Sequence, residues 1–239
     1  QEGGPLTEEY SYTNYDNLGR PIESGVCYLD PYEGISAWEF TRFQNANPDI
    51  QGLNTTNQKE QHFTQYDSPD TTGLHAALTS EGIATNNYPS QSFIAGNVSK
   101  THTKNPSTTT TWYSYDVYGR VEWLVQYIDG LGTKTIDYEY DFAKGHVNKV
   151  IYQKYSSTEM FVHRYNYNNA GQLDKVETSL DGITYTTHAN YNYYENGALK
   201  RTNIANGLQG IDYVYNLNGQ LKAINHPSLN AKLDPGGDT

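Results

Sequence analysis

The stretch "YNYNNAGQLDKVETSLDG" at residues 165–182 joins a tyrosine pair, a turn signal and a closing Asp-Gly. Tyr165 and Tyr167 stand two positions apart, so in a β-strand both rings lie on one face, because strand side chains alternate. Asn and Gly in "NNAG" tolerate positive φ and are typical of hairpin turns. The stretch therefore predicts two antiparallel strands joined by a tight turn.

The same pattern recurs through the second half of the chain. "YSYDVYGRVEWLVQYIDG" at residues 113–130 has the same tyrosine pair, the same glycine and the same ending. The register glycines follow at intervals of 26 residues and finally 22: Gly119, Gly145, Gly171, Gly197 and Gly219. A tyrosine pair precedes each of them: Tyr113/Tyr115, Tyr138/Tyr140, Tyr165/Tyr167, Tyr191/Tyr193 and Tyr213/Tyr215. A fixed period of this kind indicates repeat architecture.

The pattern continues beyond each glycine. The second position after it is aliphatic in all five copies: Val121, Val147, Leu173, Leu199 and Leu221. The copy "YEYDFAKG" has one residue more, which predicts a bulge or a longer turn. A single hairpin is not stable alone, so we expect stacked antiparallel hairpins that form one continuous curved sheet. Cross-strand ladders of tyrosine on tyrosine and aliphatic on aliphatic should hold this all-β repeat array together.

Composition agrees with a β protein and excludes several functions. The 239 residues include 23 Tyr, 6 Phe and 21 Gly, and the net charge of −11 leaves no basic stripe for nucleic acid. That charge also disfavours an anionic membrane surface, and no apolar run approaches the roughly 20 residues of a membrane helix. Cys27 is the single cysteine, which excludes an intrachain disulfide and a thiolate zinc site. The opening "QEGGPLTEEY" does not resemble a signal peptide, and we expect a longer parent chain.

The first half is less regular. "YTNYDNLGRPIESG" at residues 12–25 carries a further copy, with Pro21 in the aliphatic position, and "FTQYDSPDTTG" at 63–73 is a degraded copy. Between Gly82 and Thr111, the Asn, Ser, Thr and Pro content predicts long connections and edge strands, more exposed than the array. The predicted division is an irregular N-terminal β region, five repeats and a tail: 1–112, 113–227 and 228–239.

The residues of these copies resemble a known family. "YSYDVYGRVEWLV" and "YDNLGR" match the Tyr-Asp-x-x-Gly-Arg pattern of the YD repeat of Rhs proteins. "LQGIDYVYNLNGQLKAINHPSLN" is similar to the part of bacterial Rhs-type proteins that leads toward their core domain. The resemblance covers residues 113–227 and is patchy before them. The other copies depart from the pattern at the Arg position (His146, Gln172, Ala198, Gln220) and at the Asp position (Asn168, Tyr194, Asn216).

The resemblance implies an architecture and a role. In this family the repeats form a β-strip that spirals into a hollow shell around a C-terminal polypeptide, often a toxin. Relatives belong to insecticidal toxin complexes and to teneurin-type cell-surface proteins. Five repeats are too few to close such a shell, so this chain is expected to be a segment, secreted or at a bacterial cell surface. Asp234 and Asp238 in "DPGGD" lack the motif of the family's self-cleaving core.

Candidate chemistry is sparse. The histidines follow no zinc-binding spacing, and no Gly-x-Ser-x-Gly elbow is present: His62, His75, His102, His146, His163, His188 and His226. Asp137, Glu139 and Asp141 alternate along one strand and suit a glycosidase or calcium, although a solvent-facing row is the favoured interpretation. Asn54 and Asn97 lie in glycosylation sequons, and Cys27 is expected to be inert. We expect no catalytic residue, cofactor or metal.

These observations favour a non-enzymatic structural segment of an Rhs/YD-repeat shell that encapsulates a toxin-like polypeptide. Its partners would be the rest of the parent polypeptide and the enclosed cargo. The tyrosine pairs and register glycines are predicted to be structural, although aromatic rows also stack on sugars. The runner-up is a cell-surface adhesin or carbohydrate-binding repeat protein, or a self-assembling fibre subunit. A glycoside-cleaving enzyme is the third hypothesis.

Overall fold

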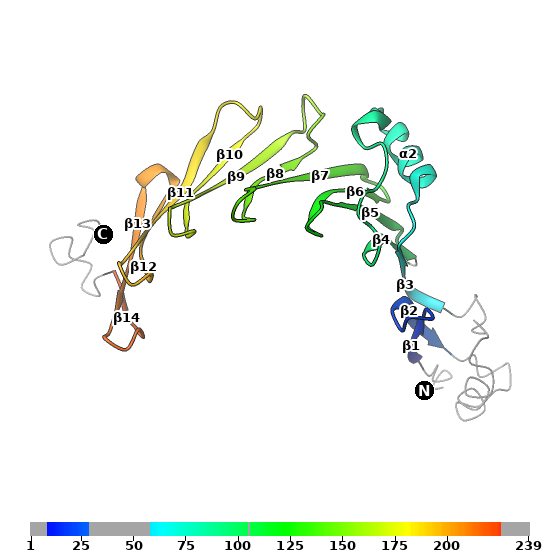
Figure 1. Cartoon of the computed structure of the whole chain (residues 1–239), viewed down its shortest axis with the longest axis horizontal. Helices are drawn as coiled ribbons and strands as arrows, with labels where there is room; N and C mark the ends of the chain where they lie inside the picture. The colour runs from blue at the N-terminus through cyan, green and yellow to red at the C-terminus, as the bar shows by residue number, and fades with distance from the viewer. Residues whose placement is uncertain (1–8, 29–57, 105, 226–239) are drawn as a thin grey trace, which may run out of the picture. The chain divides into compact units, whose positions relative to one another are not determined.

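The computed structural model describes residues 9–28, 58–104 and 106–225. Fourteen antiparallel strands follow one another in chain order in one sheet, which confirms the predicted all-β array of hairpins (Figure 1). The chain divides into two compact units, Gln1–Lys134 and Thr135–Thr239. No helix of the described residues has the length and apolar character needed to cross a membrane.

The first unit contains six strands and a short helical region between β3 and β4. Its elements are β1 (Glu9–Tyr15), β2 (Pro21–Tyr28), β3 (Gln58–Tyr66), α2 (Thr71–Ser80), η3 (Thr85–Asn87), β4 (Val98–Lys104), β5 (Thr109–Tyr115) and β6 (Val121–Ile128). The strand β7 (Gly132–Tyr140) begins in this unit and continues into the second. The other strands of the second unit are β8 (Val147–Tyr152), β9 (Phe161–Tyr167), β10 (Leu173–Ser179), β11 (Thr186–Tyr193), β12 (Leu199–Ile204), β13 (Gln209–Tyr215) and β14 (Leu221–Ile224), with η4 (Ala205–Gly207) between β12 and β13.

Hairpin register corrects one sequence prediction. Tyr165 lies opposite Val176 and Tyr167 lies opposite Leu173, so each tyrosine faces a non-aromatic residue across the hairpin. The predicted tyrosine-on-tyrosine cross-strand ladder is wrong, because the turn places the residues before the glycine opposite those after it. Tyr138 and Tyr140 instead make a ring contact along one strand, with their centroids 6.4 Å apart.

A register shift marks every hairpin of this type. The shift falls next to the pair that the last tyrosine of the first strand forms with the first residue of the second strand. It is found in seven hairpins: β1–β2, β3–β4, β5–β6, β7–β8, β9–β10, β11–β12 and β13–β14. A bulge of this kind leaves one residue outside the ladder and increases the local twist. The sequence predicted a bulge or longer turn only for the copy "YEYDFAKG", whereas register shifts are a general feature of these hairpins.

The main apolar core lies in the first unit, where α2 packs on one face of the sheet. Asp70 caps the helix by accepting a hydrogen bond from the Gly73 amide at 3.0 Å. Leu74 and Leu78 stand one turn apart, so they share a helix face, and both are fully buried. They pack in one cluster with four buried aromatic and aliphatic side chains: Tyr88, Trp112, Trp123 and Val125. We call this side of the first unit the helix face.

The stretch between Gly82 and Thr111 therefore differs from its prediction. Tyr88 and Ser99 in this stretch are fully buried. The strands β4 and β5 are internal strands of the sheet rather than edge strands. The polar composition of this stretch predicted exposed residues, but Ser side chains can be buried where their hydroxyls donate to backbone carbonyls. Ser99, for example, donates its hydroxyl to the Gln65 carbonyl at 3.1 Å.

The second unit buries charged groups on one face of its sheet. Glu177 is 5% exposed and accepts hydrogen bonds from Arg164 Nε at 2.8 Å and Asn166 Nδ2 at 2.9 Å. Lys175 adds an ion pair at 2.9 Å. Burial alone would raise the pKa of Glu177, but the hydrogen bonds from Lys175, Arg164 and Asn166 hold that pKa below its ordinary value. A second buried carboxylate, Asp212, pairs with Arg201.

Replacement of a buried leucine by alanine should cost more unfolding free energy than the same replacement of an exposed leucine. Leu78→Ala should lower the free energy of unfolding of the first unit by about 2–5 kcal/mol, because it leaves a cavity against the tryptophans. Urea unfolding followed by tryptophan fluorescence measures this loss. Leu180→Ala is the control, since Leu180 is 75% exposed, and it should change the free energy by less than about 0.5 kcal/mol. Equal losses in the two variants would contradict the assigned core.

Candidate functional site

The candidate site is a row of turns along the hairpins, and the turn from Asp116 to Arg120 shows its geometry. Asp116 Oδ1 accepts hydrogen bonds from the amides of Tyr118 at 2.9 Å and Arg120 at 3.0 Å. Arg120 Nε donates to Asp116 Oδ2 at 2.7 Å. Gly119 has φ +76, a left-handed conformation that a residue with a Cβ rarely adopts, and its amide donates to the Asp116 carbonyl at 3.0 Å. One carboxylate therefore closes the whole turn.

The turn from Asp16 to Arg20 repeats these contacts. Asp16 Oδ1 accepts from the amides of Leu18 and Arg20 at 2.9 Å each, and Arg20 Nε donates to Asp16 Oδ2 at 2.7 Å. Pro21 pairs opposite Tyr15. The copy predicted at residues 12–25 is confirmed as a hairpin of the same type.

Copies that depart from the Asp–Arg pattern keep its geometry with neutral side chains. Asn168 Nδ2 donates to Gln172 Oε1 at 2.9 Å, and the Gln172 amide donates to Asn168 Oδ1 at 3.0 Å. Asn216 and Gln220 form the same pair, at 2.9 Å for each bond. An amide pair thus replaces the ion pair. The backbone amide still donates to the side-chain oxygen of the first residue, but the side-chain hydrogen bond is reversed, since Asn donates to Gln where Arg donates to Asp. The copy at Tyr194 closes through the backbone, from the Tyr194 amide to the Ala198 carbonyl at 2.8 Å, and Asn196 Oδ1 accepts from the Ala198 amide at 3.1 Å.

The copy with one extra residue forms the longer turn that the sequence predicted. The Asp141 amide donates to the His146 carbonyl at 2.7 Å, whereas the other turns close one residue earlier. Gly145 still donates its amide to the Asp141 carbonyl, at 3.0 Å. The register glycine therefore keeps its place despite the added residue.

In four hairpins a tyrosine hydroxyl forms a hydrogen bond to the preceding hairpin. The last tyrosine of a strand donates to the carbonyl of the first residue of the preceding strand. We call this contact the tyrosine clasp. It joins Tyr66 to Pro21 at 3.1 Å, Tyr115 to Val98 at 2.8 Å, Tyr167 to Val147 at 3.0 Å and Tyr193 to Leu173 at 2.7 Å. Burial raises the pKa values of the Tyr115, Tyr167 and Tyr193 hydroxyls.

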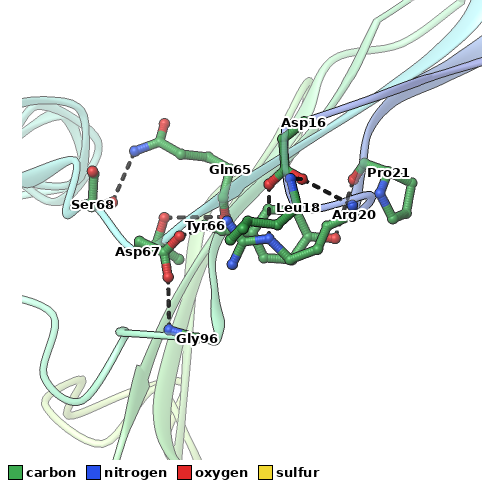
Figure 2. A network of polar contacts seen from close by, with 10 residues as sticks. Asp16, Leu18, Arg20, Pro21, Gln65, Tyr66, Asp67, Ser68 and Gly96 are labelled. Carbon is green, nitrogen blue, oxygen red and sulfur yellow. Dashed lines mark hydrogen bonds and ion pairs between the residues drawn. The ribbon is translucent and has the colours of Figure 1, made fainter.

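Side chains at the Arg position extend the connection to the next turn. Arg20 Nη2 donates to Asp67 Oδ2 at 2.6 Å and its guanidinium lies 4.3 Å from the Tyr66 ring centroid, in the network that Figure 2 shows. Hydrogen bonds from Arg20 and the Gly96 amide hold the pKa of Asp67 below its usual value. Gln172 Nε2 donates to the Gly197 carbonyl at 3.0 Å. Turns, clasps and these lateral contacts together form what we call the turn row.

A third hairpin turn, between β3 and β4, is split by an insertion that sequence analysis missed. The Asp67 amide donates to the Asn97 carbonyl at 3.3 Å. The Gly96 amide donates to Asp67 Oδ1 at 2.6 Å, as Figure 2 shows. Gly96 has φ +80, like the register glycines. The degraded copy predicted at residues 63–73 is thus the first half of a repeat. The signal that could have found its second half is Gly96-Asn97-Val98, which matches Gly-Arg-Val at residues 119–121.

The structure places the predicted structural residues on equivalent positions within each unit. Each tyrosine pair ends a strand, and each register glycine follows in the turn with positive φ. Tyr15 is the last tyrosine of β1, which is the first strand in the sheet order, and its side chain is 61% exposed. Tyr215 packs edge-on against Tyr194, with ring centroids 6.3 Å apart. That these residues are structural stays a prediction, which the variants below test.

Asp137, Glu139 and Asp141, the candidate acidic row, have different surroundings in the structure. Asp137 is 7% exposed and lies 3.8 Å from Lys154 Nζ, so the expected solvent-facing row is wrong at this position. Glu139 pairs with Lys149 at 2.8 Å, and Asp141 lies in the following turn. Within residues 9–28, 58–104 and 106–225, no group of three or more His, Cys, Asp or Glu side chains could hold a metal ion. Asn54, His226, Asp234, Asp238 and the side chain of Cys27 lie outside the described residues.

No family model matches the chain, and no curated protein matches it. Among solved structures, the chain is similar to a chain of the TcdB2–TccC3–Cdc42 complex, with 15% sequence identity and a TM-score of 0.51. The match covers 91% of this chain and 10% of that one, so this chain spans a tenth of its length. A match to a protein of unknown function from Bacteroides fragilis has 10% identity, covers 84% and 94% of the two chains, and has a TM-score of 0.17, which carries no argument. The first likeness concerns the fold alone, and it supports an Rhs-like fold.

Removal of one clasp hydroxyl tests the turn row. Tyr193→Phe keeps the ring but leaves the Leu173 carbonyl without its donor, and we expect a loss of about 0.5–1.5 kcal/mol in the free energy of unfolding. Tyr15→Phe is the matched control, because Tyr15 ends the first strand of the sheet and is mostly exposed. Urea unfolding monitored by circular dichroism measures both. A loss for Tyr15→Phe as large as that for Tyr193→Phe would contradict the clasp.

Exchange of an ion pair for an amide pair tests the turn chemistry. Arg120→Gln alone should destabilise the chain by about 0.2–1 kcal/mol, because it breaks a partly exposed ion pair. Adding Asp116→Asn should restore stability, because the double variant reproduces the Asn168–Gln172 pair. Thermal unfolding of both single variants and the double variant gives the coupling. Strictly additive losses would show that the two side chains do not act together.

Alkaline pH should weaken the fold through the clasps. The pKa values of Tyr115, Tyr167 and Tyr193 are raised in the folded chain, so below the ordinary pKa of 10.0 these hydroxyls are protonated whether folded or unfolded. Above that pH the unfolded chain loses these protons first, so stability falls until the folded pKa values are passed. Urea midpoints at pH 8, 10 and 11 measure the fall. A variant with phenylalanine at all three positions should lose less stability over this range, and an identical loss would contradict the assignment.

Proposed function

We propose that this chain is a non-enzymatic structural segment of a secreted or cell-surface Rhs/YD-repeat shell, which encloses a C-terminal polypeptide. The turn row is the observation that carries the proposal. Clasps and lateral contacts recur within each unit, so neighbouring hairpins of one unit are bonded through side chains as well as through the backbone ladder. A sheet built in this way extends by addition of hairpins, which suits a wall rather than a compact catalytic domain.

Physical properties of such a wall suit containment. Its backbone hydrogen bonds pair strand with strand, so a protease that needs an extended, unpaired segment finds few sites within it. The two sides of the β9–β10 hairpin differ: Tyr165, Tyr167 and Val176 face one side, and the Arg164–Glu177 ion pair faces the other together with the buried Val162. In this proposal, the chain acts with the rest of its parent polypeptide and with the enclosed cargo as partners, and nucleic acid is not a partner.

The test is limited proteolysis of the natively purified parent protein, followed by intact-mass analysis. We expect a resistant shell fragment that retains a second, protected polypeptide. The same digestion with Tyr167→Phe and Tyr193→Phe together should expose that polypeptide sooner, because two clasps are weakened. A resistant fragment without any retained polypeptide would contradict containment.

Carbohydrate binding is the second candidate, and one groove favours it. A groove of about 490 Å³ on the helix face is lined in part by Phe63, Lys100 and His102. The rings of Phe63 and His102 lie 5.9 Å apart, and burial, with the Lys100 and Lys104 charges, lowers the pKa of His102. Such a mixture of rings and polar groups suits a sugar. Saturable binding on a glycan array that Phe63→Ala abolishes would favour the adhesin over the shell.

A further inference from the structure

Residues 68–95 occupy the place of two residues in a regular turn. In the turn of β5–β6, two residues separate Asp116 from Gly119, whereas 28 residues separate Asp67 from Gly96. The two ends nevertheless meet, since Asp67 bonds both to the Gly96 amide and to the Asn97 carbonyl. The turn is therefore closed by contacts between its halves and not by the length of the chain that joins them.

The hairpin on either side of the insertion keeps its regular register. Tyr66 lies opposite Val98, as Tyr115 lies opposite Val121, and the register shift falls at the equivalent position in both hairpins. Tyr66 also forms its clasp with Pro21 at 3.1 Å. The insertion thus leaves both the strand pairing and the link to the previous hairpin intact.

The inserted residues cover an apolar patch on the helix face, formed by Trp112, Trp123 and Val125. Leu74 and Leu78 of α2 and Tyr88 pack on this patch, with the Tyr88 and Trp123 ring centroids 5.2 Å apart. Gln91 anchors the same segment by donating to the Tyr113 carbonyl at 2.9 Å.

The equivalent positions of an uncovered hairpin are charged. The repeat offset of 52 residues between Gly119 and Gly171 aligns the apolar patch with Arg164, Lys175 and Glu177. These three residues form the ion-pair network of the second unit, at 2.7 Å and 2.9 Å. The same three positions of the repeat are therefore apolar where a helical segment covers them and ionic where β9 and β10 carry no such cover among the described residues.

We propose that residues 68–95 are a module inserted into a repeat turn, and that the positions of Trp112, Trp123 and Val125 are its docking surface. The turn closes across the insertion, and the three positions of the repeat determine whether a module docks on its face. This inference goes beyond the proposed shell, because it concerns how a repeat accepts an added module and holds whatever the sheet encloses.

Excision of the module from the full chain tests the proposal. In the first variant, Asn-Ala, as found at residues 169–170, replaces residues 68–95 and the apolar patch is kept. This variant should self-associate in sedimentation velocity and bind a fluorescent apolar dye, because the patch is uncovered. The second variant adds Trp112→Arg, Trp123→Lys and Val125→Glu. It should be monomeric, with the amides of β3 and β4 as protected from hydrogen exchange as in the parent chain.

A third variant separates turn closure from the need for the module. It carries the same three substitutions and replaces residues 68–95 with 28 residues of Gly and Ser. Protection of β3 and β4 in both substituted variants supports the proposal, and loss in both overturns it. Loss in the Asn-Ala variant alone overturns the claim that the two halves close as a regular turn. A monomeric first variant that binds no dye overturns the docking surface. Protection of β9 and β10 serves as the internal control for folding.

Discussion

The hydrogen bond from a strand-ending tyrosine to the carbonyl that opens the preceding strand recurs in four hairpins, and we propose that the array depends on it. A hairpin buries little apolar area, so it needs its neighbours, and the backbone ladder alone does not select which edges meet. The tyrosine ring packs on the sheet while its hydroxyl supplies a donor to a carbonyl next to a register shift, where bulges leave ladder positions unpaired. Phenylalanine would supply only the first of these, which is a reason for tyrosine at the four clasp positions.

The turn itself is held by one short polar side chain, and this explains how the repeat varies without losing its form. Asp116 with Arg120 and Asn168 with Gln172 present an acceptor to the same backbone amide and a side-chain partner in the same place. Charge and the direction of the side-chain hydrogen bond are therefore dispensable at this point, whereas the acceptor for the backbone amide is kept. In the Tyr194 copy the side-chain acceptor comes from another position of the turn, because Asn196 Oδ1 accepts from the Ala198 amide.

Much of this organisation could be predicted from the sequence, because it follows from the spacing of tyrosines, turn residues and glycines that are close together in the chain. Hairpins, register glycines and the longer turn at Asp141 follow from periodicity and turn chemistry, and they are found as expected. The helical module could not be predicted in the same way, because its turn is divided between Asp67 and Gly96 and no local pattern joins them. The surface that the module covers was also missed, since Trp123 and Val125 stand two positions apart on β6 as in any strand with one buried face, and only the covering helix explains their apolar character. The burial of Asp137 and the pairing of tyrosines with non-aromatic residues depend on cross-strand register, which composition does not reveal.

Hydrogen exchange of the native chain, resolved to individual strands, tests the central claim most directly. If the turn row stabilises hairpins that no helix covers, the amides of β9 to β12 exchange with protection of the same order as those of β5 and β6 beneath α2. Protection confined to the strands beneath the helix, with rapid exchange from β9 to β12, would show that the clasps do not stabilise the sheet and would contradict the account.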